Sequence, residues 1–178
     1  MEYLESGSLT DKIKNHNNSP LYNDSVLKYL VQILEGVEFL HQNKIYHSDI
    51  KPANILYTAE ANLKICDFGI LTQLDNASSS SDYYLKGDSH YMSPERLNGA
   101  SRSAPNDIWA IGATFVEMIC GHPLNHLNIV HTQLILNISQ NNILIEGIPK
   151  DDFLKTLPSD FRKEIISTTL CKVEERAK

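Results

Sequence analysis

The segment 107–120, DIWAIGATFVEMIC, limits the possible folds of this 178-residue chain more than any other segment. It is apolar on nearly every side, so a helix formed by it must be buried all round rather than along one stripe. Gly121 can end that helix as a C-cap, and Pro123 prevents the helix from continuing. We therefore expect a central helix that sits in the middle of the folded unit.

A second long helix is expected over residues 24–43, where apolar side chains recur at helical spacing. The spaced positions are Val26, Leu30, Ile33, Val37 and Leu40, with Leu27 and Leu34 beside them. Asn23 or Asp24 can cap the start of this helix. Shorter helices are expected at 134–138 and 161–170, so the fold class is mainly α.

Two short β-like runs follow the second helix, at 55–57 and 63–66. The loop TAEAN separates them, which predicts a small β-hairpin. From Gly69 to Gly87 the chain is polar and includes four consecutive serines at 78–81. This composition predicts a loop with no core of its own.

Composition excludes several classes of protein. Hydrophobic residues make up 42% and charged residues 21%, as in an ordinary globular domain. The net charge of -6, without a basic stripe, argues against nucleic acid as a partner. The start MEYLESGSL does not resemble a signal peptide, and no apolar run is long enough to span a membrane. The three cysteines lie far apart, as in a reduced, cytoplasmic protein.

The run IYHSDIKPANIL, residues 45–56, holds several side chains that suit phosphoryl transfer. Asp49 could accept a proton from a substrate hydroxyl, and Lys51 would project to the same side of an extended loop. Asn54 offers an amide oxygen that suits Mg²⁺, and Asp67 follows a strand-like run directly before Phe68-Gly69. A base, a cation and two metal ligands are the parts that this reaction needs.

The succession HSDIKPAN, ICDFG and YMSPERL resembles the eukaryotic protein kinases in order and approximate spacing. Each piece alone is weak, but the combination is highly specific. Lys51-Pro52 after Asp49 is similar to the serine/threonine class, and YMSPERLNG resembles the group that acts upstream of mitogen-activated protein kinases. The resemblance implies ATP and Mg²⁺ as cofactors and a protein substrate with a Ser or Thr acceptor. It also implies an upstream or downstream kinase as a signalling partner.

The resemblance also assigns roles to individual residues. Asp49 becomes the catalytic base and Lys51 the contact to the γ-phosphate, while Asn54 and Asp67 bind Mg²⁺. The implied ATP-binding set contains Glu2, Leu4, Lys51, Asn54, Leu56 and Asp67. Four residues are expected to be structural. His47 is expected to pack in the core, and Asp107 to hydrogen-bond the backbone of the catalytic loop. Glu95 is expected to pair with Arg176.

On this basis residues 1–178 form a partial kinase domain, with the hinge at 1–7, the catalytic loop at 45–56 and the activation segment at 67–95. The sequence contains no Gly-rich loop, strand lysine or helix glutamate of the kind that the family places before the hinge. We therefore expect a kinase-like C-lobe whose N-lobe is missing, and expect this fragment to be inactive.

Two positions depart from the family pattern. Ser48 stands where the family has an arginine that pairs with a phosphorylated activation-loop residue, so control by such phosphorylation is in doubt. Asp88 stands where the family usually has a threonine that bridges the catalytic Asp and Lys. A carboxylate there is expected to repel Asp49 and to draw Lys51 away, with Ser89 as a substitute if the loop shifts.

These departures leave an alternative hypothesis open, a catalytically inactive kinase-like module that binds partners or acts as a scaffold. Ser48, Asp88 and the absent N-lobe favour it. The retained Asp49, Lys51 and the two metal ligands oppose it, because a scaffold has no physical need of all four.

Overall fold

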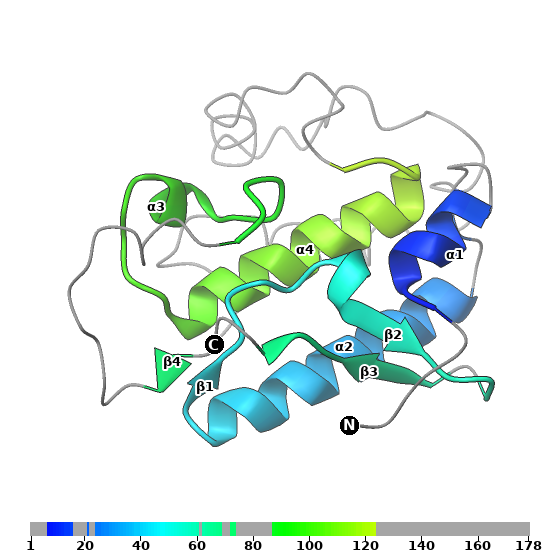
Figure 1. Cartoon of the computed structure of the whole chain (residues 1–178), viewed down its shortest axis with the longest axis horizontal. Coiled ribbons are helices and arrows are strands. Elements are labelled where there is room, and N and C mark those ends of the chain that lie inside the picture. The colour runs from blue at the N-terminus through cyan, green and yellow to red at the C-terminus, as the bar shows by residue number, and fades with distance from the viewer. Residues whose placement is uncertain are drawn as a thin grey trace.

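The structure is a computed structural model that describes residues 7–15, 21, 24–60, 62–68, 72–73 and 87–123. Its helices are α1 (Leu9–Asn15), α2 (Asp24–Gln42), α3 (Pro94–Leu97) and α4 (Ala104–Cys120), with a 3-10 turn η1 (Pro52–Asn54) (Figure 1). Its strands are β1 (Ile45–Tyr46), β2 (Ile55–Tyr57), β3 (Leu63–Ile65) and β4 (Thr72–Gln73). The mainly α fold with a small hairpin is confirmed for this part of the chain.

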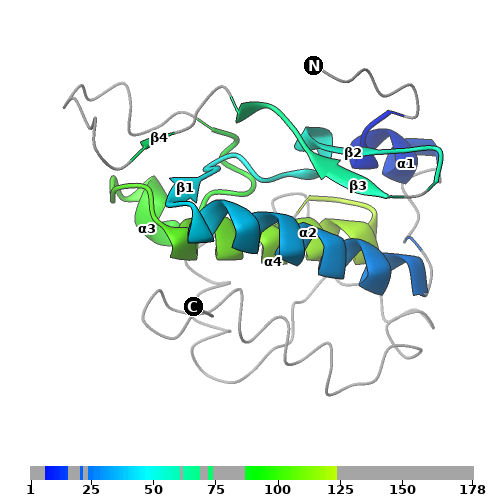
Figure 2. The same cartoon turned by 90° about the horizontal axis from the view of Figure 1, so that it is seen from below.

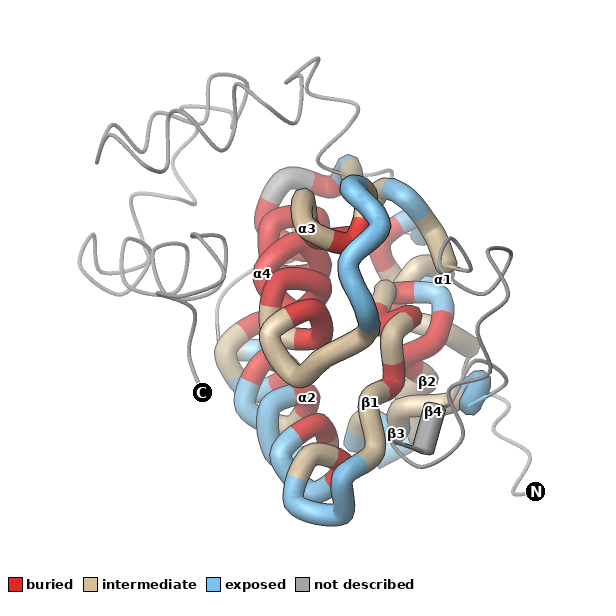
Figure 3. The backbone as a smooth tube through the Cα atoms, turned by 90° about the vertical axis from the view of Figure 1, so that its left-hand side faces the viewer, coloured by how far each residue is buried: buried red, intermediate tan, exposed pale blue. Residues whose placement is uncertain are grey.

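Helix α4 lies in the middle of the described fold, as the sequence predicts. Residues 109–119 are all buried, and Figure 3 shows the helix in the colour of buried residues along most of its length. It begins at Ala104 rather than at Asp107, because the Ser103 N–H donates to Asn106 Oδ1 at 2.8 Å and extends the first turn. Gly121 ends the helix in a left-handed conformation with φ 77°, as expected of a C-cap.

Helix α2 packs along α4, and the two helices lie side by side in both cartoon views (Figure 2). The spaced residues that the sequence singles out form its buried stripe: Val26, Leu30, Ile33, Val37 and Leu40. The opposite face carries Val31, Leu34 and Phe39, which are exposed. α2 buries one stripe of side chains against α4, which is buried on nearly all sides. The core is therefore a pair of helices, and the strands lie beside it.

The strands form two small antiparallel sheets. β2 pairs with β3 in the expected hairpin, with Ile55 opposite Ile65 and Tyr57 opposite Leu63. β1 pairs with β4, with Tyr46 opposite Thr72. Two residues of the segment 69–87, for which the sequence predicts a loop with no core of its own, thus form a strand. A strand of two residues is too short to show an alternating pattern.

Other expectations lie outside the described residues. These are the helices at 134–138 and 161–170, the serines at 78–81 and the proposed hinge up to residue 6. Within the described ranges, no helix combines the length and the apolar character needed to cross a bilayer.

Two phenylalanines provide a matched test of this packing. Phe115 on α4 is 0% exposed, whereas Phe39 on α2 is 65% exposed. Replacing Phe115 with Ala should lower the free energy of unfolding by about 3–5 kcal/mol, because the change removes buried apolar surface and leaves a cavity. Phe39→Ala should change it by about 0.5 kcal/mol or less. Urea unfolding followed by circular dichroism measures both, and equal losses would contradict the central position of α4.

Candidate active site

The carboxylate of Asp107, in the first turn of α4, fixes the loop that carries the candidate catalytic residues. Asp107 is 0% exposed and accepts three hydrogen bonds. Its Oδ1 receives the Ser48 N–H at 2.7 Å, and its Oδ2 receives the His47 N–H and His41 Nε2, both at 2.9 Å. Since a carboxylate only accepts, His41 presents a protonated Nε2. The structural role expected of Asp107 is therefore present in the geometry.

Ser48 turns the chain between the anchored backbone and Asp49. Its φ of 65° is left-handed, which is uncommon for a residue other than glycine. Its Oγ is buried and has no hydrogen-bond partner among the described residues. Ser48 borders a cavity of about 20 Å³ that Asp88, Tyr91 and Arg96 also line. A space of this size suits a single water molecule, which could satisfy the serine hydroxyl.

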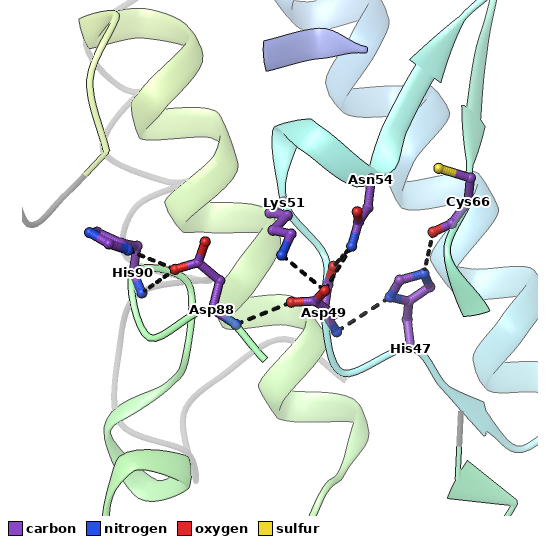
Figure 4. A network of polar contacts seen from close by, with 7 residues as sticks. All are labelled: His47, Asp49, Lys51, Asn54, Cys66, Asp88 and His90. Carbon is purple, nitrogen blue, oxygen red and sulfur yellow. Dashed lines mark hydrogen bonds and ion pairs between the residues drawn. The ribbon is translucent and has the colours of Figure 1, made fainter. Parts of the chain in front are cut away.

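Asp49 is the centre of a cluster of polar contacts (Figure 4). It is 8% exposed, and its Oδ2 receives Asn54 Nδ2 at 2.8 Å and lies 3.1 Å from Lys51 Nζ. Its Oδ1 receives the backbone N–H of Asp88 at 3.2 Å. Lys51 has an extended backbone and the turn η1 follows it, so Asn54 returns toward Asp49. The structure thus brings together three side chains that the sequence selects, including Lys51 on the same side as Asp49.

The residues expected to hold Mg²⁺ lie on two adjoining segments. The Cys66 N–H donates to the Asn54 carbonyl oxygen at 2.9 Å, which places Asp67 next to the end of η1. The Asn54 amide donates to both the backbone and the side chain of Asp49, so its Oδ1 is the atom left to face a cation. Asp67 is exposed and has a left-handed φ of 61°.

This donor set fits Mg²⁺ by its chemistry, because an amide oxygen and a carboxylate are hard ligands. The described residues contain no group of three or more His, Cys, Asp and Glu that could enclose a metal ion. Mg²⁺ usually binds through one or two carboxylates and completes its shell with water and substrate phosphates. Asn54 and Asp67 therefore suit an ion that arrives with a nucleotide better than a permanently enclosed one.

His47 is a packed core residue, as predicted. It is 0% exposed, its Nε2 contacts the Cys66 carbonyl oxygen at 3.0 Å, and its Nδ1 receives the Asp49 N–H at 3.3 Å. Its ring packs edge-on against Phe68, with 5.2 Å between the ring centroids. Burial, together with the negative charge of Asp67, raises the pKa of the Cys66 thiol. His47 thus joins the catalytic loop to the segment before Asp67.

Asp88 does not behave as the sequence leads us to expect. Its Oδ1 receives His90 Nδ1 at 2.6 Å and the His90 N–H at 3.1 Å, while Lys51 stays with Asp49. Burial favours a higher pKa for Asp88, but the hydrogen bonds from His90 and the charges of His90 and Lys51 lower it overall. Ser89 is exposed, and the contact with Asp49 comes from the Asp88 backbone instead.

The remaining site residues are placed as follows. Glu95 receives a hydrogen bond from Asn106 Nδ2 at 2.9 Å, which ties α3 to the start of α4. Leu56 is half-buried in β2 and forms an isolated β-bridge with Ser8. Glu2, Leu4 and Arg176 lie outside the described residues, so their predicted roles stay predictions.

Sequence reasoning missed three contributors to this site: His41, His90 and Asn106. His41 and Asp107 are 66 residues apart in the chain, so no local spacing could connect them. The Asp88–His90 contact spans two positions, but its direction depends on how the loop turns. Asn106 could have been found from the sequence, because a polar residue at the start of an apolar helix often caps that helix.

Comparisons with known proteins show which proteins this chain is similar to. The family model described as "Protein kinase domain" matches residues 1–177. A probable serine/threonine-protein kinase of Dictyostelium discoideum is 39% identical over 69% of the chain. MAP3K epsilon protein kinase 1 of Brassica napus is 38% identical over 67%, and the dual specificity mitogen-activated protein kinase kinase dSOR1 of Drosophila melanogaster is 37% identical over 85%. The matched segments cover 24%, 9% and 37% of those three proteins, respectively.

The anchoring role of Asp107 can be tested with Asp107→Asn. Whichever way the new amide turns, its NH₂ group faces at least one N–H donor that now lacks an acceptor. Leaving such a buried group unsatisfied should cost about 1–3 kcal/mol in the free energy of unfolding. Amide hydrogen exchange at His47 and Ser48 should also become faster.

Glu35→Gln is the matched control, because it removes the same charge at an exposed position of α2. It should change neither the urea midpoint nor the exchange rates of the loop. Unchanged exchange at both loop amides in Asp107→Asn would contradict the anchoring role.

Proposed function

This chain belongs to the protein kinase domain family, and we propose that it transfers the γ-phosphoryl group of ATP to a Ser or Thr hydroxyl of a protein substrate. The observation that carries the proposal is the convergence of Lys51 and Asn54 on the carboxylate of Asp49, at 3.1 Å and 2.8 Å. These are the groups that phosphoryl transfer requires for positioning and for charge stabilisation.

In this proposal Asp49 orients the acceptor hydroxyl and takes its proton. The hydroxyl oxygen forms a bond to the γ-phosphorus while the bond from that phosphorus to the β–γ bridging oxygen breaks, and ADP leaves. Oδ2 of Asp49 already meets Lys51 and Asn54, whereas Oδ1 receives a single longer contact of 3.2 Å from Asp88. Oδ1 is therefore the atom better placed to accept the proton.

Lys51 and the two metal ligands serve the phosphate side of the reaction. Lys51 lies against Asp49, so its charge can act on the phosphoryl group as that group approaches the substrate oxygen. Asn54 and Asp67 would hold Mg²⁺, which neutralises negative charge on the nucleotide phosphates. The hydrogen bonds from the Asn54 amide to Asp49 fix the direction in which its oxygen points.

The finer part of the proposal is that the chain corresponds to the C-terminal lobe of a kinase domain, with the hinge at 1–7 and the activation segment at 67–95. An apolar groove of about 330 Å³ between α2 and β3 supports it, since Ile33, Leu63, Ile65 and Phe68 line this groove. Such a surface suits packing against another part of a kinase domain.

The setting of the reaction is also part of the proposal. We place the protein inside the cell, where ATP and Mg²⁺ are available, and in a signalling pathway with another kinase as a partner. The similarity to a MAP3K epsilon protein kinase of Brassica napus and to a mitogen-activated protein kinase kinase of Drosophila melanogaster supports such a pathway. The retained Asp49, Lys51, Asn54 and Asp67 speak against the alternative of an inactive binding module.

Phosphoryl transfer can be measured with ATP labelled at the γ-phosphate and a protein acceptor. We expect the 178-residue chain to be inactive or nearly so, and the longest reading frame that contains it, extended upstream of Met1, to be active. Asp49→Asn in that longer protein should lower turnover by about 10²–10⁴-fold, because it removes the base. Glu38→Gln, at an exposed position of α2, is the control with an unchanged rate.

The outcomes separate the two parts of the proposal. Robust transfer by the 178-residue chain, abolished by Asp49→Asn, would contradict the C-lobe assignment and leave the kinase function standing. A longer protein that binds ATP but transfers no phosphate would overturn the kinase function and favour the binding module.

Regulation gives a separate prediction, because Ser48 carries no charge and its hydroxyl is buried. It cannot form the charge-assisted pair with a phosphorylated side chain that an arginine would form. The active protein should therefore keep most of its turnover after phosphatase treatment. A related kinase with arginine at this position is the control, and it should lose turnover. A large loss in this protein as well would count against the prediction.

A further inference from the structure

We propose that His90 is a positioning residue for this reaction: by holding the side chain of Asp88, it keeps the Asp88 backbone N–H and Lys51 on the catalytic Asp49. The inference deepens the kinase function proposed above and rests on it. It assigns a role to Asp88, which departs from the family pattern, and to His90, which lies outside the motifs that identify the family.

The geometry places Asp88 between two partners. Its carboxylate oxygen Oδ1 receives both Nδ1 and the backbone N–H of His90, at 2.6 Å and 3.1 Å. Its own backbone N–H donates to Asp49 Oδ1 at 3.2 Å. Figure 4 shows His90 and Asp49 on opposite sides of Asp88. The side chain is thus turned away from the catalytic carboxylate while the backbone is turned toward it.

Electrostatics explain why this orientation matters. Asp49 and Asp88 are like charges, and Lys51 is a cation that both could bind. Lys51 Nζ lies 3.1 Å from Asp49, and its charge also acts on Asp88. Without His90, the Asp88 carboxylate would be released to compete for Lys51 and to repel Asp49. Either change would move the groups that orient the substrate hydroxyl.

The other charged and titratable neighbours have contacts of their own. On α4, Asp107 accepts the loop N–H groups and Glu117 accepts the Tyr91 hydroxyl. On α3, Arg96 Nη1 donates to the Ala100 carbonyl oxygen at 2.6 Å. Within the described ranges, the side chain that hydrogen-bonds the Asp88 carboxylate is therefore that of His90.

The exposure of this pair separates a positioning role from a purely structural one. The side chains of His90 and Asp88 are 40% and 35% exposed. Ion pairs at such positions contribute little to the free energy of unfolding. Removing His90 should therefore leave the fold intact, so an effect on turnover would report on the position of Asp49 and Lys51.

The test compares His90→Ala with the double variant His90→Ala, Asp88→Asn in the active form of the protein. His90→Ala should lower kcat by at least about tenfold with little change in KM for ATP, because it misplaces catalytic groups. The double variant should regain most of that loss, since it no longer carries a competing carboxylate. His122→Ala, an exposed histidine after α4, is the control and should leave kcat unchanged.

A second readout does not depend on activity. Carbon-13 NMR of the Asp88 carboxyl group in the 178-residue chain should show a pKa below its usual range, and His90→Ala should raise it. An Asp88 titration that His90→Ala does not move would overturn the inference while leaving the kinase function intact. An unchanged kcat in an active protein would overturn it too. If the longer protein transfers no phosphate at all, the proposed function and this inference fail together.

Discussion

The buried carboxylate of Asp107 is the interaction on which the rest of the site depends. A charge at 0% exposure is costly unless hydrogen bonds replace its hydration, and here three donors do so. Two of them are backbone N–H groups of the loop that leads to Asp49, and the third is His41 of α2. Because α4 is enclosed by the core, the carboxylate is held in place. The packing of the two long helices therefore determines the position of the loop.

Three of the described residues other than glycine have a positive φ, and two of them, Ser48 and Asp67, lie in the site. Ser48 and Asp67 both have left-handed φ values, 65° and 61°, that residues other than glycine rarely adopt. A hydrogen bond holds the chain next to each of them: Ser48 donates to Asp107, and Cys66, just before Asp67, donates to Asn54. The strained positions in the site thus lie directly before Asp49 and at Asp67, the two acidic residues to which we assign roles in the proposed reaction.

Much of this arrangement follows from local sequence, and the rest from contacts over long distances in the chain. The helix at 24–43 is predictable from its apolar spacing, the helix at 107–120 from its apolar composition, and the hairpin from two short β-like runs joined by a loop. The β1–β4 pairing is not, since each strand has two residues. In the site, the proximity of Asp49 and Lys51 follows from their spacing. The contact between His41 and Asp107 does not, because it depends on how α2 packs on α4.

The two departures from the family pattern have different physical consequences. At Asp88 the backbone N–H contacts Asp49, and His90, two positions away, hydrogen-bonds the carboxylate. At Ser48 the change leaves a buried hydroxyl beside a cavity of about 20 Å³, which a water molecule can fill but which supplies no charge. The first change is therefore accommodated by a hydrogen bond within the loop, and the second leaves an uncharged side chain directly before Asp49. The contacts around Asp49 survive both, so the departures bear on how the site is controlled more than on the groups that it assembles.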